Sequence, residues 1–229
     1  MKYIFITGVN RGIGFFLTKE LLKRGHSVIG TYRKTSDNNN LQKLKSAFSS
    51  TLNLICLDVK AIEQDTLTGY LDSFKAIDIL INNSGILDCG DVAFEKLKID
   101  DLLHSIKVNT LGPMKITQLL LPKLSESANP CVFHMTSQMG SIADNLSGGY
   151  YFYRISEAAL NIFNKSFSKD YPHILSIVIH PGWVRTDMGG NHAPISPEIA
   201  AINISDLILT ANNLSSGNFY NYKGEILPW

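Results

Sequence analysis

The sequence predicts a three-layer, doubly wound α/β fold with a central parallel sheet of about seven strands. Two observations lead to this prediction. Short apolar segments alternate along the chain with longer helix-like segments, and the connections between them are short. The apolar segments are continuous rather than alternating with polar residues, which is typical of parallel strands that are buried on both faces.

The expected elements follow one another in strand–helix order. Strands are expected at residues 3–7, 27–32, 52–57, 77–81, 131–135 and 175–180. Helices are expected at residues 14–23, 65–74, 101–121 and 151–169, and from Pro197 or Glu198 to about Thr210. Gly25 is a typical C-terminal stop for the first helix, and the asparagines at 38–40 are interpreted as a short polar loop. Without a linker or an internal repeat, residues 1–229 are expected to form one domain.

The composition excludes several classes of function. The formal net charge is +1, so no global field attracts nucleic acid or an acidic membrane. Cys56, Cys89 and Cys131 form no CxxC pair and no metal-ligand spacing, which indicates a reducing compartment and no metal site. No apolar run approaches the roughly 18 residues of a membrane span, and no signal peptide is apparent. We therefore expect a soluble, cytoplasmic protein with no nucleic-acid or membrane partner.

A glycine-rich turn follows the first predicted strand and opens the first predicted helix. It reads Thr7-Gly-Val-Asn-Arg-Gly-Ile-Gly14, with the spacing G-x3-G-x-G. Gly8 permits a tight turn, Gly12 lets the backbone approach a pyrophosphate, and Gly14 lets the helix pack close to the sheet. A plain strand–turn–helix is the alternative interpretation. The position of the turn at the start of an alternating α/β chain favours dinucleotide binding.

This turn resembles the T-G-x3-G-x-G cofactor motif of the short-chain dehydrogenase/reductase family, whose members have a Rossmann fold. The tetrapeptide Asn-Asn-Ser-Gly at 82–85 resembles the N-N-A-G of that family, and the pair at 58–59 resembles its Asp-Val. The resemblance implies that Asn82 packs against the adenosine half of the cofactor and that Asp58 reaches the adenine amine. It also implies cofactor contacts from a further set of residues, namely Asn10, Ile13, Val59, Ser84 and Gly85.

The end of the second strand indicates which dinucleotide binds. NAD enzymes place an acid there for the ribose 2′-hydroxyl, whereas NADP enzymes place an arginine for the 2′-phosphate. Here Arg33 and Lys34 follow the strand, and no acid occurs before Asp37. Arg11 lies inside the glycine turn and could reach the same phosphate. Two solvated surface arginines are the alternative, but we expect NADP(H) in preference to NAD(H).

The same resemblance implies a reaction site built from Asn, Ser, Tyr and Lys. In that family Tyr is the general acid in carbonyl reduction, Ser holds the substrate oxygen and Lys lowers the pKa of Tyr, which is near 10 when unperturbed. Asn109 matches the family Asn on the helix after the fourth strand, and Ser137 matches the Ser after the fifth. Taken alone, they would be interpreted as a helix-interior Asn and a strand-end cap.

The tyrosine box departs from the family pattern. The stretch 153–160, Y-R-I-S-E-A-A-L, resembles Y-R-x-S-K-A-A-L, so Tyr153 takes the catalytic position and Glu157 replaces Lys. Residues four apart share a helix face, and a carboxylate there would raise the pKa of the phenol. Tyr150 with Arg154 is an alternative pair that keeps a cation. Tyr153 is preferred because the residues behind it stay in the family register.

The C-terminal third extends the resemblance. The segment 180–190 resembles the family loop P-G-x-V-x-T over the nicotinamide, which implies contacts from Pro181, Gly182, Val184 and Thr186. The end of the chain resembles the G-x-F…G-x-x-L-P-W of C-factor-like and sniffer-like carbonyl reductases. A substrate loop is expected at about residues 186–197 within the same domain.

Two functions follow from these motifs. The first is an NADP(H)-dependent reductase that converts an aldehyde, ketone or quinone to an alcohol with Tyr153 as general acid. The second is a weakly active or inactive NADP(H)-binding sensor or partner-binding module, because Glu157 replaces Lys. In a third interpretation, Glu157 is exposed and another cation such as Arg154 serves the site. By resemblance, the helices at 101–121 and 151–169 would form a homodimer or homotetramer.

Overall fold

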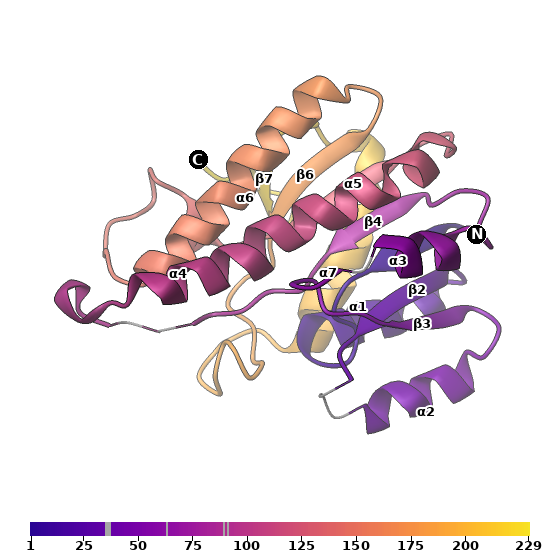
Figure 1. Cartoon of the computed structure of the whole chain (residues 1–229), viewed down its shortest axis with the longest axis horizontal. Coiled ribbons are helices and arrows are strands. Elements are labelled where there is room, and N and C mark those ends of the chain that lie inside the picture. Colours follow the sequence, from indigo (N-terminus) through magenta and orange to yellow (C-terminus); the bar gives the residue numbers. More distant parts are fainter. Residues whose placement is uncertain (35–37, 63, 89, 91) are drawn as a thin grey trace.

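The computed structural model describes residues 1–34, 38–62, 64–88, 90 and 92–229, so Asp37 and Cys89 lie outside the described residues. Seven parallel strands form one sheet in the order β3-β2-β1-β4-β5-β6-β7. Helices cover both faces of the sheet (Figure 1). The predicted three-layer α/β fold with a central parallel sheet is thereby confirmed.

Six strands occupy the predicted apolar segments, with ends shifted by no more than a few residues. The seventh strand, β7, is short and adds an edge beside β6. The strands are β1 (Tyr3–Ile6), β2 (Ser27–Tyr32), β3 (Leu52–Cys56), β4 (Ile79–Asn82), β5 (Cys131–Met135), β6 (Leu175–His180) and β7 (Phe219–Asn221).

The helices also follow the predicted order, with two differences. The helix expected at 101–121 is divided by a π-helical turn at Lys107–Leu111. The polar loop expected at the asparagines is wrong for its last two residues, because Asn39 and Asn40 begin a helix whose Leu41 and Leu44 are buried. The helices are α1 (Gly12–Lys23), α2 (Asn39–Ala47), α3 (Gln64–Leu71), α4 (Ile99–Ile106), α5 (Gly112–Ser125), α6 (Tyr151–Asp170) and α7 (Pro197–Leu209).

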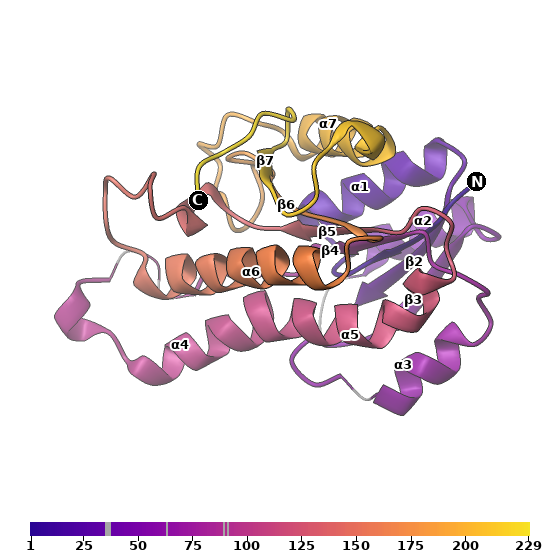
Figure 2. The same ribbon diagram turned by 90° about the horizontal axis from the view of Figure 1, so that it is seen from above.

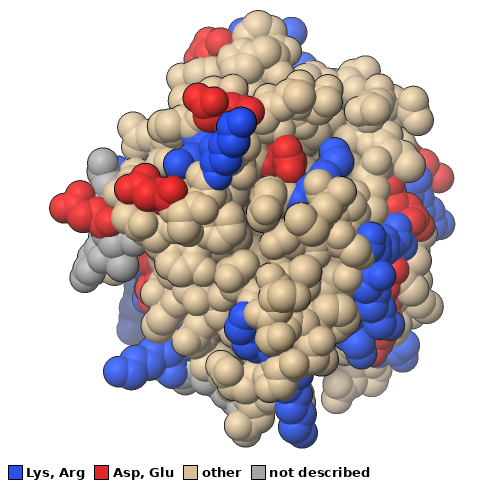
Figure 3. Space-filling model, turned by 90° about the vertical axis from the view of Figure 1, so that its right-hand side faces the viewer, with Lys and Arg blue, Asp and Glu red and all other residues tan. Residues whose placement is uncertain are grey.

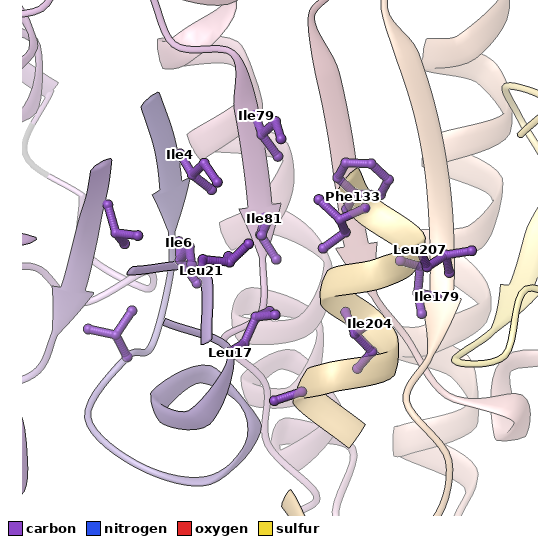
Figure 4. Packing of buried hydrophobic residues seen from close by; sticks show 14 of the residues in the cluster. Ile4, Ile6, Leu17, Leu21, Ile79, Ile81, Phe133, Ile179, Ile204 and Leu207 are labelled. Carbon is purple, nitrogen blue, oxygen red and sulfur yellow. The ribbon is translucent and has the colours of Figure 1, made fainter. Parts of the chain in front are cut away.

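Two apolar layers hold the helices to the sheet. Helices α1 and α7 pack side by side on one face, while α3, α4, α5 and α6 cover the other (Figure 2). Alternate residues of each strand face opposite layers, so Ile79 and Ile81 contact the α1–α7 layer whereas Leu80 faces the α5 layer. Figure 4 shows the first layer, in which Leu17 of α1 and Ile204 of α7 lie against the strands.

The chain reverses its direction of travel across the sheet at β1. It moves from β1 to β2 and β3, and then returns to place β4 on the other side of β1. Ligands bind at such a switch point, outside the carboxyl ends of the strands. In the described part of the chain no helix is long and apolar enough to cross a membrane. Acidic and basic side chains are interspersed on the face shown in Figure 3.

Candidate active site

A cleft opens at the carboxyl ends of the strands, on both sides of the switch point. The glycine turn, the ends of β2 and β3, the loop after β4, helices α4 and α6 and the loop after β6 all contribute to it. The predicted site residues that line the cleft are Gly8, Asn10, Arg11, Gly12, Ile13, Gly14, Arg33, Asp58, Val59, Ser84, Gly85, Tyr153, Glu157, Pro181 and Thr186. The predicted residues outside its lining are Asn82, Asn109, Ser137, Gly182 and Val184.

The glycine turn is closed by direct backbone packing. Gly8 has a φ of 73°, and its N–H donates to the carbonyl oxygen of Thr31 at 3.0 Å. A Cβ on Gly14 would lie 2.1 Å from the carbonyl oxygen of Gly8, which is closer than any real contact. Helix α1 can therefore begin directly against the turn only because residue 14 is a glycine.

The start of α1 fits a phosphate group. Arg11 is the N-cap residue, no side chain caps the first turn, and that turn contains no acidic residue. The first N–H groups of a helix have no partner within the helix, and the helix dipole favours an anion beside them. This uncapped helix start lines the cleft, so the residues present fit the pyrophosphate of a dinucleotide.

The two asparagines after β4 have different surroundings. Asn82 is buried, and its side-chain N–H2 lies 3.1 Å from both Thr117 Oγ1 and His134 Nδ1. Its side chain therefore points into the core, and the expected contact of Asn82 with the adenosine has no support in this geometry. Asn83 lines the cleft instead and donates to the carbonyl oxygens of Thr7 and Gly8 at 2.9 Å and 3.1 Å.

The two arginines predicted to bind the 2′-phosphate both line the cleft. Arg33 is exposed at the end of β2. Arg11 Nη1 lies 2.6 Å from Asp187 Oδ2, so it forms an ion pair with the loop after β6. The positively charged end of the cleft is therefore present, with one of its two cations paired to a carboxylate.

Two basic residues that the sequence did not single out line the cleft near Asp58. The Oδ1 atom of Asp58 accepts a hydrogen bond from the backbone N–H of Lys60 at 3.0 Å. Lys60 Nζ lies 3.4 Å from His104 Nε2, and His104 Nδ1 lies 2.6 Å from Asp88 Oδ2. Lys60 and His104 are 44 residues apart in the chain, so no local pattern could have paired them.

The reaction end of the cleft contains Tyr153 and Glu157, one helical turn apart on α6. The Ser137 side chain acts on the Tyr153 phenol and lowers its pKa, although Ser137 itself lies behind the lining of the cleft. Burial and the neighbouring carboxyl of Glu157 have the larger effect and raise the pKa of the Tyr153 phenol well above its usual value. Tyr153 is therefore a neutral phenol near neutral pH.

Glu157 is buried, which excludes the interpretation that it is an exposed surface residue. Its exposed fraction is 4% and its Oε2 atom has no hydrogen-bond partner. Burial raises the pKa of its carboxyl to about 8. A buried carboxyl, rather than a lysine ammonium, therefore stands one turn below the phenol.

The alternative pair, Tyr150 with Arg154, lies outside the lining of the cleft. The guanidinium of Arg154 donates to the carbonyl oxygens of Gly148 and Gly149, both at 3.2 Å, and to Met139 O at 3.3 Å. Arg154 thus fixes the loop before α6, and its position does not favour a role as the cation of the site.

Asn109 lies in the π-helical turn between α4 and α5 and is buried. Its Oδ1 accepts from Ile86 N at 2.9 Å, while its Nδ2 donates to Ile86 O at 2.9 Å and to Ser156 Oγ at 3.0 Å. Ser156 Oγ in turn donates to the carbonyl oxygen of Tyr153 at 2.8 Å. Asn109 thus joins the loop after β4 to the helix turn of Tyr153, and its side chain is not part of the lining of the cleft.

The loop after β6 is folded back on itself. Val184 is buried and forms an isolated bridge with Ile195, while Gly182 has a φ of 84° and packs beneath Ile195. Thr186 Oγ1 accepts from Gly189 N at 3.1 Å. Pro181 and Thr186 reach the cleft, whereas Val184 and Gly182 support the loop from behind.

Known proteins share this sequence and this geometry. A family model for short chain dehydrogenases matches residues 2–194. C-signal from Myxococcus xanthus is 40% identical over 159 residues, which cover 67% of this chain and 93% of that protein. The carbonyl reductase Sniffer of D. melanogaster is 31% identical and superposes with a TM-score of 0.93 over 100% of both chains.

A second solved structure contains a cofactor. It is described as a short-chain dehydrogenase/reductase from Burkholderia multivorans with bound NADP. It is 31% identical, with a TM-score of 0.92 over 100% of this chain and 99% of that one. Together with the glycine turn and the tyrosine box, these matches show that the chain belongs to the short-chain dehydrogenase/reductase family of oxidoreductases.

Proposed function

We propose that this protein is an NADPH-dependent reductase that converts an aldehyde, ketone or quinone to the alcohol, with Tyr153 as the proton donor. The observation that carries this proposal is the position of the Tyr153 phenol. It lines the same cleft as the glycine turn, and the Ser137 side chain acts on it. A phenol that stays neutral is suited to protonate the oxygen of a carbonyl group as that carbonyl is reduced.

The cofactor end of the cleft supports NADP(H) rather than NAD(H). When bound, NADPH supplies the hydride for the reduction. The uncapped start of α1 would hold the pyrophosphate, and Arg33 with Arg11 would hold the 2′-phosphate. The acids that line this end already have partners, because Asp58 accepts a hydrogen bond from the Lys60 backbone and Asp187 pairs with Arg11. The NADP bound by the Burkholderia multivorans relative supports the same choice.

The remaining residues would position the substrate. Ser137 would share its hydroxyl between Tyr153 and the substrate oxygen, and Asn109 fixes the backbone of Tyr153 through Ser156. We propose that residues 186–197 cover the substrate within this same domain. Met188 lines the cleft there, and the Trp183 indole donates to Gly189 O at 2.7 Å, which braces the loop.

A second candidate function rests on Glu157. The family pattern has a lysine at this position, and here a buried carboxyl raises the pKa of Tyr153 instead of lowering it. The chain would then bind NADP(H) without turnover and act as a sensor or a partner-binding module. The neutral Tyr153 phenol in the cleft, with the Ser137 side chain acting on it from behind the lining, favours the reductase.

One experiment distinguishes the two functions. NADPH oxidation is measured with a panel of aldehydes, ketones and quinones for the wild-type chain and for Glu157→Lys. The reductase proposal expects turnover by the wild-type chain with at least one carbonyl compound. Tight NADPH binding without turnover in the wild-type chain, with turnover gained in Glu157→Lys, would establish the second function instead.

A further inference from the structure

We propose that Glu157 stores the proton of this site as a neutral carboxylic acid and returns it to Tyr153 after each reduction. The proposal rests on the proposed reductase function and concerns the one position where the chain departs from its family. Lysine cannot be replaced by a carboxylate in its electrostatic role, because the sign of the charge is reversed. A neutral carboxyl does different chemistry, since it carries a proton that can be given away.

The first support is the position of the carboxyl. Glu157 lies four residues after Tyr153 on α6, and both side chains line the cleft. Turn Gln138–Gly140 packs directly on Glu157 from the opposite side, where a Cβ on Gly140 would lie 2.9 Å from the Cβ of Glu157. The turn therefore covers the Glu157 carboxyl on one side, and the cleft with the Tyr153 phenol lies on the other side.

The second support is the hydrogen bonding around the carboxyl. Thr136 lies against Glu157, but its hydroxyl hydrogen is donated to Asn161 Oδ1 at 2.9 Å. The amide of Asn161 is oriented by its own donation from Nδ2 to Gly140 O at 3.3 Å. A hydroxyl has one hydrogen, so Thr136 is left only as an acceptor towards Glu157. Thr136 therefore does not donate to the carboxyl, whereas the backbone of Ser137 lowers the pKa of Glu157 and burial, the larger effect, raises it.

The third support is the absence of a compensating cation. Within the described residues, the carboxyl interacts with the phenol of Tyr153, the hydroxyl of Thr136 and the backbone of Ser137, and only the phenol among these three groups titrates. The basic side chains that line the cleft do not compensate the charge of this carboxyl. Arg11 contacts Asp187, Lys60 contacts His104, and Arg33 lies at the exposed end of β2. An isolated buried carboxylate is costly, so the group retains its proton.

One reaction cycle then balances its protons through Tyr153, Glu157 and the water of the cleft. The carbonyl carbon receives the hydride, and the carbonyl oxygen takes the proton of the Tyr153 phenol, so the O–H bond of Tyr153 breaks and that of the alcohol forms. The resulting phenolate takes the proton of Glu157. The Glu157 carboxylate, buried and unpaired, is reprotonated from water of the open cleft when the alcohol leaves. No oxidant or reductant other than the proposed NADPH is required.

This arrangement also sets the direction of the reaction. Alcohol oxidation needs a base to take the hydroxyl proton, and near neutral pH Tyr153 and Glu157 are both neutral acids rather than bases. The chain is therefore expected to reduce carbonyl compounds far faster than it oxidises the corresponding alcohols. This asymmetry would distinguish it from relatives in which a lysine lowers the pKa of the phenol.

The first test needs no cofactor. Infrared difference spectra of the wild-type chain against Glu157→Gln isolate the carboxyl band of residue 157 as the pH is raised. Glu126→Gln is the matched control, because Glu126 is exposed at the end of α5. The proposal expects a protonated carboxyl band at pH 7 that is lost near pH 8 and is absent from the control difference. A carboxylate band at pH 7 would overturn it.

The second test separates the first turnover from later ones. In stopped-flow reduction with NADPH, Glu157→Gln is expected to oxidise one NADPH per site at the wild-type rate and then to slow by at least about tenfold. Glu157→Asp, which keeps a carboxyl, is expected to regain part of the later rate. The wild-type steady-state rate is expected to fall about tenfold per pH unit above about pH 8, whereas the Gln variant is expected to have a flat profile.

The outcomes separate this inference from the proposed function. Equal steady-state rates for the wild-type chain and Glu157→Gln would overturn the inference and leave the reductase in place. A first turnover slowed as much as later ones would assign Glu157 a merely structural role and also overturn it. Absence of turnover by the NADPH-bound wild-type chain would overturn both.

Discussion

Arg11 and Asp187 form an ion pair, 2.6 Å between Nη1 and Oδ2, that joins the glycine turn to the loop after β6. The two residues are 176 positions apart in the chain and both line the cleft. A cation that the sequence assigns to the cofactor phosphate is therefore shared with the loop that would cover the substrate. This pair leads to the first of five predictions.

Asp187→Asn is expected to tighten NADPH binding, because Arg11 no longer has to leave a carboxylate to meet the phosphate. The pair is exposed, and exposed ion pairs contribute about 0.2–1 kcal/mol, so the gain in affinity is expected to be at most about fivefold. The measurement is the Kd of NADPH by fluorescence at low salt. Asp206→Asn, which weakens the pair between Arg24 at the end of α1 and Asp206 of α7, is the control and should leave the Kd unchanged. Weaker binding by Asp187→Asn would contradict this account.

Arg33→Ala is expected to remove the preference for NADPH over NADH. Hydrogen bonds to charged groups contribute about 1.5–3 kcal/mol, which corresponds to roughly a 10- to 100-fold loss of NADPH affinity. The Kd of NADH should change little, because NADH has no 2′-phosphate. Lys34→Ala removes a neighbouring exposed charge outside the cleft and serves as the control. Equal losses for the two cofactors would show that Arg33 does not recognise the phosphate.

Glu157→Gln is expected to flatten the dependence of stability on pH between about 6.5 and 8. The pKa of Glu157 is raised from 4.5 to about 8 in the folded chain, so the unfolded state loses this proton first. The free energy of unfolding should therefore decrease by about 1.4 kcal/mol per pH unit in this window for the wild-type chain. Histidines with lowered pKa values, such as His134, change the stability at pH values below this window. Denaturant titrations at several pH values provide the measurement, and parallel slopes for wild type and variant would refute a buried, protonated Glu157.

Asn109→Ala is expected to destabilise the fold by about 1–3 kcal/mol, because it leaves the backbone N–H and C=O of Ile86 without partners in a partly buried position. Urea denaturation provides the measurement. Asn203→Ala on the exposed face of α7 removes one side-chain hydrogen bond and should change the free energy of unfolding by less than about 0.5 kcal/mol. If both variants were equally stable, the positioning role of Asn109 would be wrong.

The fold could be predicted because its strands are apolar on both faces and its glycines mark the first turn. Helix α2 could not, because its first residues are polar asparagines and its buried face consists of few residues, notably Leu41 and Leu44. The edge strand β7 has only three residues, too few for a periodic signal.

The site residues could be predicted where a sequence motif fixes the backbone. They could be predicted less well where the direction of a side chain determines whether it reaches the cleft. Strand parity separates the two asparagines: Leu80 and Asn82 face the α5 layer, so Asn83 is the one free to turn towards the glycine turn. Contacts between distant segments, such as that of Arg11 with Asp187, leave no local signal. The burial of Glu157 likewise depends on how turn Gln138–Gly140 packs on α6.

The central claim is that Tyr153 protonates a carbonyl substrate in an NADPH-dependent reduction. Its most direct test is the steady-state rate of NADPH oxidation with an accepted carbonyl compound for wild type, Tyr153→Phe and Tyr150→Phe. The account predicts a fall of roughly 100- to 10 000-fold in kcat for Tyr153→Phe with NADPH binding retained, and little change for Tyr150→Phe. A Tyr153→Phe variant that keeps the wild-type rate, or a loss confined to Tyr150→Phe, would contradict it.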